Sequence, residues 1–342
     1  MSSLKLDASL GTEGEYLKRS RATARVAEEL GFSGLWSSET QHDGFMPLAL
    51  AADATERISL GTSIAVAFSR SPMEIAQTVW DLQNLSNGRF VLGLGTQVKA
   101  HVTRRFSMPF DRPAARLKDY ILALHAIWRS FQTGESLKYE GEFYRHTLLT
   151  PFFNPGPIEH PEIPIHIAGV NEHLATLAGE VCDGFHVHPF HSPEYVRQTI
   201  LPSIERGASN EGRSAEGVDL VASAFVVTGD SEREIRDQRE AMRSQAAFYA
   251  STPSYRIVLE AHGWQDVGER LSSLARDKKW DEMPALITDE MLSAFTVEAP
   301  PDQVGTALKE RYEGLVDRIS LYLPFVPGER DDFWRKVVEG IR

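Results

Sequence analysis

The sequence predicts an α/β protein built as a (β/α)8 TIM barrel with insertions at its C-terminal face, and three observations support this. Short apolar runs bounded by turn residues recur along the 342 residues, as is typical of buried parallel strands. Amphipathic segments at helical spacing separate these runs. The runs number about eight, and alternating β and α units in that number favour a closed barrel over an open doubly wound sheet.

Each apolar run is assigned to one barrel strand, in chain order. The runs are Leu4–Leu10, Gly34–Ser37, Ile58–Ala67, Arg89–Gly95, Ile163–Gly169, Gly184–His188, Val218–Thr228 and Arg318–Pro324. Residues 134–164 depart from the rhythm with a hairpin pattern around Gly141 and a proline-rich stretch. Residues from about 246 to 300 are helical, with no strand candidate as strong as the others. We expect both excursions at the barrel mouth and interpret residues 1–342 as a single domain.

Composition and charge narrow the class of function. The formal net charge of -12 and the lack of a basic cluster argue against a nucleic-acid partner. The single cysteine, Cys182, can form neither an internal disulfide nor a thiolate metal cluster, which fits a reducing compartment. Residues 1–10 lack the apolar core of a signal peptide, and no later run is long enough to span a bilayer. We therefore expect a cytoplasmic protein that acts on a small molecule, without a membrane partner.

Four segments resemble, in order and spacing, the bacterial luciferase-like monooxygenase superfamily. The first is Gly31–Glu39, an apolar strand that ends in an acidic residue, and the others are Glu56–Thr62, Leu85–Phe90 and Leu92–Gly95. The resemblance covers most of residues 4–190. It implies a luciferase-like TIM-barrel oxidoreductase that binds a flavin or a deazaflavin.

Two further segments concern the cofactor. Glu39–Asp43 and His101–Pro109 are similar to the branch of oxidoreductases that depend on the deazaflavin coenzyme F420. Relatives that oxidise alcohols or sugar phosphates carry a His after the acidic residue and a Glu after the fourth strand, where this chain has Thr40 and Val98. The resemblance therefore implies hydride transfer between F420 and a small organic substrate, as a reductase that uses reduced F420. FMN is the alternative cofactor, and a homodimer is the usual assembly of relatives.

The resemblance also implies a cis peptide bond without proline at the end of the third strand, in a bulge behind the cofactor ring. The matching bond is Ser63–Ile64, and the alternative is a trans strand with Ile64 in the core. Ala168–Asn171 offers backbone N–H groups at a helix start for a cofactor phosphate, with Arg256 as a further partner, or it is a simple turn. The expected cofactor-binding residues are Asp7, Ser63, Ile64, Thr96, Gln97, Ala168, Gly169, Val170 and Asn171.

Acid–base chemistry is expected beside the second strand, because hydride transfer changes the charge of the substrate. Glu39 and His42 are the candidate catalytic residues. The alternatives are that Glu39 pairs with backbone or charge at the strand end and that His42 is a loop residue without a role. The residues expected to line the substrate pocket are Phe68, His101, His186 and His188.

A metal site is an alternative use of the histidines. His186 and His188 are two apart on a strand and so face the same side, and His166 could add a third ligand. However, the first strand has no His-x-His pattern, and the last ends in Leu323 and Pro324 without an Asp. We expect no metal. The alternatives left open are an FMN-dependent monooxygenase, a barrel metallohydrolase and a flavin-binding protein without turnover.

Overall fold

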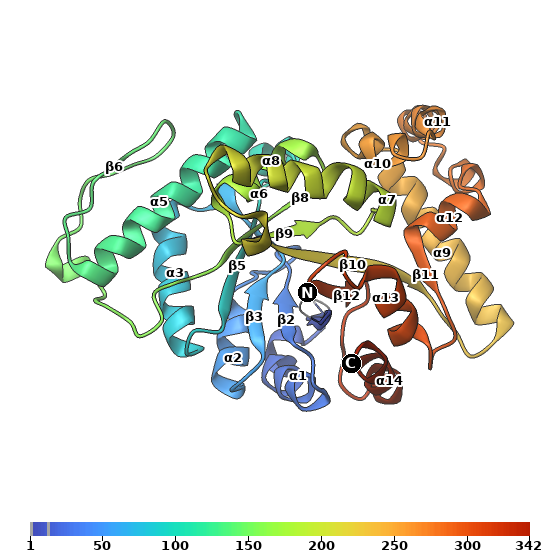
Figure 1. Cartoon of the computed structure of the whole chain (residues 1–342), viewed down its shortest axis with the longest axis horizontal. Coiled ribbons are helices and arrows are strands. Elements are labelled where there is room, and N and C mark those ends of the chain that lie inside the picture. Colours follow the sequence, from blue (N-terminus) through green and yellow to red (C-terminus); the bar gives the residue numbers. More distant parts are fainter. Residues whose placement is uncertain (1–2, 12–13) are drawn as a thin grey trace.

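A closed barrel of parallel strands lies at the centre of the protein, whose computed structural model describes residues 3–11 and 14–342 (Figure 1). Each barrel strand pairs in parallel with the next, and the last returns to the first. In order around the barrel, the strands are β1 (Lys5–Ser9), β2 (Gly34–Ser37), β3 (Ser59–Thr62), β5 (Phe90–Gly95), β8 (Ile165–Gly169), β9 (Gly184–Val187), β10 (Asp219–Val227) and β12 (Arg318–Leu321). The predicted fold class is confirmed.

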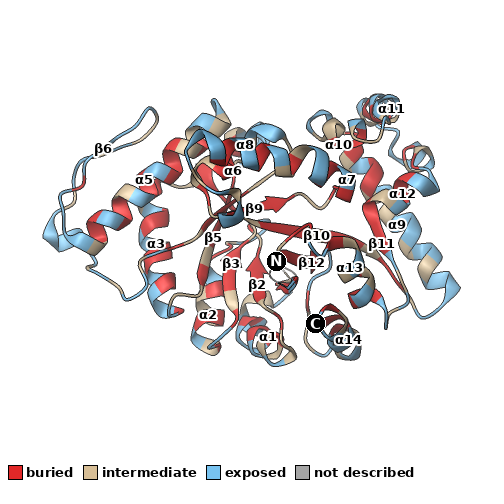
Figure 2. Cartoon of the chain, in the orientation of Figure 1, coloured by how far each residue is buried: buried red, intermediate tan, exposed pale blue. Residues whose placement is uncertain are grey.

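Helices surround the barrel and turn their buried faces toward the strands (Figure 2). In α3, for example, Ser71 accepts a hydrogen bond from the backbone N–H of Glu74 at 3.1 Å, and Ile75 and Val79 are fully buried. The main helices are α1 (Tyr16–Leu30), α2 (Met46–Ala54), α3 (Pro72–Leu85), α4 (Lys99–Arg104), α5 (Pro113–Thr133), α6 (Glu172–Val181), α8 (Leu201–Asn210), α9 (Glu232–Ala250), α13 (Val304–Tyr312) and α14 (Asp331–Ile341). Among the described residues, no helix is both long and apolar enough to cross a membrane.

The third predicted strand is interrupted by a bulge. Strand β3 ends at Thr62, and β4 (Ala65–Val66) resumes the pairing with the same neighbour, β5. Gly61 pairs with Val91 and Ala65 pairs with Leu94, so the interrupted strand advances one residue more than its partner over this interval. The peptide bond between Ser63 and Ile64 is cis, as predicted.

The first excursion forms the predicted hairpin, from β6 (Tyr139–Glu140) and β7 (Arg145–His146). It lies along the outer side of α5 (Figure 1). Asp119 of α5 accepts from the backbone N–H groups of Phe143 at 2.6 Å and Tyr144 at 2.9 Å. The expectation that this excursion lies at the barrel mouth is therefore wrong for the hairpin, which packs against the outer side of α5.

The second excursion covers the end of β9 and contains a strand that the sequence did not indicate. Its helices include α10 (Arg256–Glu260), α11 (Gln265–Arg276) and α12 (Asp289–Phe295). Directly after them, β11 (Thr296–Glu298) pairs in parallel with the last residues of β10. The expected excursion was helical and irregular, without a strand candidate as strong as the others; the structure adds this short strand, which lies outside the closed barrel.

Candidate active site

The predicted cofactor-binding residues at the C-terminal ends of β3, β5 and β8 lie on one side of the barrel mouth. These three strands are neighbours, and the C-terminal ends of parallel strands meet at the same face of a barrel. Thr62 and Ala65 are fully buried, whereas Ser63 and Ile64 between them are half-buried. The other half-buried positions are Thr96, Gln97, Ala168, Gly169, Val170 and Asn171. Each of these positions is thus partly exposed at the ends of three neighbouring strands, above buried residues of the barrel.

The residues that follow β2 hold the bulge at this surface. The hydroxyl of Ser38 donates to the backbone carbonyl of Ser63 at 2.8 Å. The backbone N–H of Glu39 donates to the backbone carbonyl of Ile64 at 3.1 Å. The backbone N–H of Ser63 in turn donates to the carbonyl of Ser37 at 2.8 Å. Both bulge residues are therefore fixed by backbone contacts from the neighbouring strand end.

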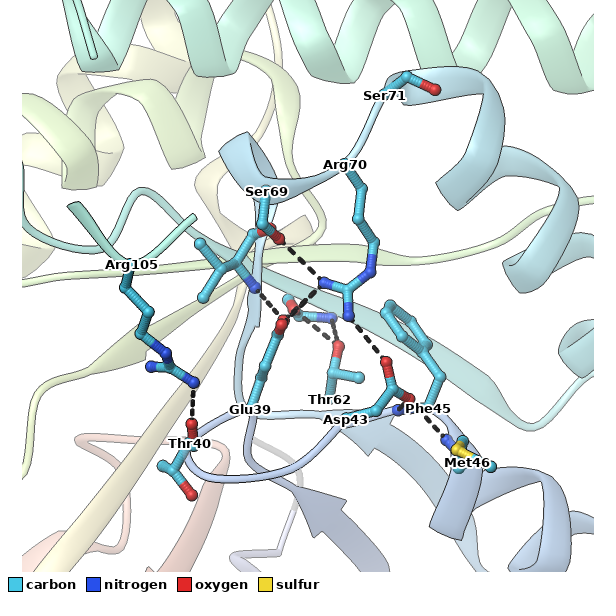
Figure 3. Close-up of polar contacts among 12 residues, drawn as sticks. Glu39, Thr40, Asp43, Phe45, Met46, Thr62, Ser69, Arg70, Ser71 and Arg105 are labelled. Atoms are coloured by element: carbon cyan, nitrogen blue, oxygen red, sulfur yellow. Dashed lines mark hydrogen bonds and ion pairs between the residues drawn. The ribbon is translucent and has the colours of Figure 1, made fainter. Parts of the chain in front are cut away.

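Glu39 is buried in an ion pair beside the bulge (Figure 3). Its carboxylate accepts from the backbone N–H of Val66 at 2.7 Å and from Nη1 of Arg70 at 2.8 and 2.9 Å. Nη2 of Arg70 donates to Asp43 at 2.7 Å. Glu39 was predicted to be either a catalytic residue or a residue that pairs with backbone or charge at the strand end. The structure shows the pairing, with the backbone of Val66 and with Arg70.

Arg70 was missed by sequence reasoning, because no local pattern separates an arginine that reaches into a site from one that points to solvent. Burial lowers its pKa, but its hydrogen bonds and the charges of Glu39 and Asp43 outweigh burial, so the pKa is raised above its ordinary value. The guanidinium therefore stays charged and neutralises carboxylate charge beside the mouth.

His42 and Glu39 are not brought together by any contact among the described residues. His42 is exposed and stacks on Tyr16 with ring centroids 4.6 Å apart. His101 is likewise exposed, on α4. Phe68 is fully buried beneath Arg116, whose guanidinium lies 4.9 Å from the ring centroid, so it contributes no open pocket surface.

Asp7 lies in the interior of the barrel, and its exposed fraction is 1%. Its two carboxylate oxygens accept from Nε and Nη2 of Arg318 at 2.8 and 2.7 Å, and the indole N–H of Trp36 donates to it at 2.8 Å. The structure therefore places Asp7 below the mouth surface, in a bidentate ion pair, rather than among the half-buried residues expected to contact the cofactor.

His186 and His166 also lie inside the barrel, where they contact each other. Nδ1 of His166 is 3.3 Å from Nε2 of His186, and Nδ1 of His186 is 3.3 Å from the hydroxyl of Ser63. Burial, and then the charge of Arg318, lowers the pKa of His186 to about 3. Burial, His186 and Arg318 lower the pKa of His166 well below its ordinary value. Both rings are therefore neutral at neutral pH.

His188 lies apart from that pair, packed among aromatic residues of the second excursion. Its ring stacks on Tyr255 and meets Tyr249 edge-on, with centroid distances of 4.6 and 4.7 Å. Burial, and then His191, lowers its pKa to about 3. In the part of the chain that the structure describes, no three His, Cys, Asp or Glu side chains gather as a metal site. The tyrosines were not predicted, since their segment gave no pattern that ties it to β9.

The turn after β8 has the predicted helix start. The side chain of Asn171 accepts from the backbone N–H of Leu174 at 3.1 Å and caps α6. A Cβ at Gly169 would lie 2.7 Å from Cβ of Leu174, so the close approach of strand and helix requires glycine. Arg256 donates to Ser272 at 3.0 Å, and its Nε is buried without a partner.

Comparisons with known proteins place this barrel in a family. Residues 1–318 match the family described as luciferase-like monooxygenase. An uncharacterized protein of Mycobacterium tuberculosis is 45% identical over 316 residues, which cover 92% of each chain. A putative coenzyme F420-dependent oxidoreductase of the same organism is 28% identical over 323 residues, covering 88% of this chain and 90% of the relative.

A solved structure has the same fold. The coenzyme F420-dependent tetrahydromethanopterin reductase of Methanopyrus kandleri aligns with a TM-score of 0.75 at 22% identity, over 99% of this chain and 97% of that one. With a family match that spans residues 1–318 and a barrel of the same architecture, this chain belongs to the luciferase-like monooxygenase family.

Proposed function

We propose that this protein is an oxidoreductase that transfers hydride from reduced coenzyme F420 to a small organic substrate. The observation that carries the proposal is the half-buried surface at three adjacent strand ends, β3, β5 and β8, on a chain related to a putative F420-dependent oxidoreductase. A flat ring system needs such an open surface above a closed core, with few polar groups that fix its orientation.

The residues present fit an anionic cofactor. Glu39 and Asp7, the predicted site residues that carry a carboxylate, are each paired with an arginine, so their charge is compensated. The start of α6 after Gly169 offers backbone N–H groups and the positive end of a helix dipole, which favour a phosphate. We propose Gly169, Val170 and Asn171 as the phosphate contacts, and Ser63 and Ile64 as the contacts to the ring.

The bound cofactor would supply the hydride, and the chain supplies binding, orientation and exclusion of water. Tyr249 and Tyr255 cover the end of β9 together with His188, so they would shield that side of the mouth from solvent. His188 is neutral at neutral pH and therefore does not act as a cationic acid. Because Glu39 is held by Arg70, His42 is the predicted group left free to exchange a proton with the substrate or solvent.

FMN remains the alternative cofactor, since the family is described as monooxygenases and the helix start of α6 suits the phosphate of either molecule. We also propose that the protein acts as a homodimer, on small molecules alone. Light scattering of the purified protein tests the assembly, and a mass of one chain, 38.2 kDa, would reject it.

The deciding experiment is a fluorescence titration of the protein with F420 and, separately, with FMN. We expect saturable binding of F420 and weaker binding of FMN. Ala168→Leu should weaken binding at least tenfold by filling the half-buried surface, whereas Ala22→Leu on the exposed side of α1 should bind as wild type. Tighter binding of FMN would support the monooxygenase alternative, and binding of neither would refute the redox assignment.

A further inference from the structure

A line of three polar groups connects the mouth surface with the interior of the barrel. It begins at the half-buried hydroxyl of Ser63, passes through His186 and ends at His166, with a distance of 3.3 Å at each step. A Cβ at Gly184 would lie 2.5 Å from the ring of His166, so the absence of a side chain makes room for this ring. The line is therefore built into the packing of the strands.

Proton counting restricts how the line can be hydrogen-bonded. A neutral imidazole has one N–H donor and one bare nitrogen acceptor. Burial keeps both rings neutral, and the charge of Arg318, which is paired with Asp7, also opposes protonation of both. The two contacts must therefore run in the same direction, either from Ser63 into the barrel or from His166 toward the mouth.

The inward direction is favoured by the intrinsic preference of imidazole, whose proton lies more often on Nε2 than on Nδ1. If Ser63 donates to Nδ1 of His186, then Nε2–H of His186 donates to Nδ1 of His166, and both rings carry their proton on Nε2. The outward direction would place both protons on Nδ1. The tautomers of the two rings are coupled, because neither ring can change its tautomer without breaking a contact. The preference of each imidazole for a proton on Nε2 therefore favours the same direction.

We propose that His186, supported by His166, is a positioning residue that turns the hydroxyl proton of Ser63 into the barrel. The hydroxyl oxygen of Ser63 then faces the mouth with its lone pairs free, as a hydrogen-bond acceptor for an N–H or O–H group of the ligand. The proposal rests on the proposed function only in taking the mouth as the ligand site; the direction of the line is a property of the protein alone.

Nitrogen-15 NMR of imidazole-labelled protein without ligand tests the direction. Two other histidines, the buried His191 and the half-buried His188, serve as internal references with opposite tautomers. His191 Nδ1 lies 2.9 Å from a carbonyl oxygen, which can only accept, so its proton is on Nδ1. His188 Nδ1 accepts from the backbone N–H of Phe190 at 3.1 Å, so its proton is on Nε2. Signals of His166 and His186 are assigned by their loss in His166→Asn and His186→Asn.

We expect His166 and His186 to share the tautomer of His188, and to keep it from about pH 5 to about pH 9. Ser63→Ala should shift the Nδ1 signal of His186, which loses its donor, and leave His191 unchanged. A proton on Nδ1 of either His166 or His186, or protonation of His186 within this pH range, would overturn the proposal. The NMR measurement decides between the two directions whether or not the protein binds a cofactor.

Ligand affinity tests the consequence at the mouth. Ser63→Ala should weaken cofactor binding roughly tenfold, as expected for one hydrogen bond. His186→Phe should cause a similar loss without touching the ligand, whereas His186→Asn retains an acceptor near Ser63 and should bind within about threefold of wild type. The double variant Ser63→Ala/His186→Phe should be no weaker than either single variant, because both act through one hydroxyl.

Equal binding by wild type and His186→Phe, or additive losses in the double variant, would overturn the positioning role. If the wild-type protein binds neither F420 nor FMN, the proposed function fails while the NMR result still decides the direction of the line. The two failures are therefore separate observations.

Discussion

The ion pair between Asp7 and Arg318 has a close geometric match at the surface, which allows the effect of burial to be measured by itself. In the barrel, Nε and Nη2 of Arg318 donate to Asp7 at 2.8 and 2.7 Å, and the side chains are 7% and 0% exposed. At the surface, Nε and Nη2 of Arg239 donate to Glu298, both at 2.7 Å, with side chains 45% and 39% exposed. The perturbations are Asp7→Asn and Glu298→Gln, each of which removes the negative charge.

The expected losses differ because only one variant leaves an unpaired charge in the barrel. Removing one partner of a buried pair costs about 3–5 kcal/mol of unfolding free energy. An exposed pair contributes at most about 1 kcal/mol. In a chain of 342 residues, each kcal/mol corresponds to roughly 1.5 °C, so Asp7→Asn should lower Tm by about 5–7 °C and Glu298→Gln by at most about 1.5 °C.

Urea denaturation followed by circular dichroism measures both unfolding free energies, and calorimetry gives the two Tm values. The double variant Asp7→Leu/Arg318→Met should recover part of the loss, because it leaves no buried charge. Equal losses for Asp7→Asn and Glu298→Gln would refute the reasoning that burial, rather than hydrogen-bond geometry, determines the cost.

Three further predictions concern the mouth and the barrel wall. Glu39→Gln and Arg70→Met should each lower the free energy of unfolding by about 1–3 kcal/mol. Because both variants remove the same ion pair, a double-mutant cycle measured by urea denaturation should give a coupling energy of more than about 1 kcal/mol. Additive losses would contradict the pairing. Stability should fall as pH decreases from about 6.5 toward about 3, because His188 of the unfolded chain binds a proton that the half-buried His188 of the folded protein does not. His188→Phe should make this fall shallower by up to about 1.4 kcal/mol per pH unit, and an unchanged slope would show that His188 titrates alike in both states. Gly184→Ala should lower the free energy of unfolding by about 1–3 kcal/mol, because the added Cβ would lie 2.5 Å from the buried ring of His166. In the control Gly217→Ala the added Cβ meets open space, so this variant should be neutral or slightly stabilising. Equal thermal stability of the two variants would argue against the close packing.

The strands could be predicted because each is a short apolar segment between turn residues, a pattern that burial on both faces of a parallel sheet produces locally. Gly34–Ser37 has the same bounds in sequence and structure. The strand Thr296–Glu298 could not be found in this way, because three residues are too short for a pattern and the strand exists only through its pairing with β10.

The site was predicted less completely, because its contacts join residues that are distant in sequence. Asp7 is 311 residues from Arg318, and nothing near either residue indicates the pair. His186 and His188 were grouped by strand alternation, but His188 lies beyond the last paired residue of β9, where the excursion carrying Tyr255 determines its neighbours. The residues at the helix start of α6 were found because an N-cap and a glycine are local signals.

The glycines in the barrel wall have an evolutionary consequence. A Cβ at Gly61 would lie 2.3 Å from the indole of Trp36, and one at Gly34 would lie 2.5 Å from the guanidinium of Arg318. Each large interior group thus depends on a glycine, without a side chain, on another strand of the barrel. We expect the two residues of such a pair to change together during divergence. The large interior residue should be replaced by a smaller one before the glycine can be replaced, so substitutions inside the barrel should occur in pairs.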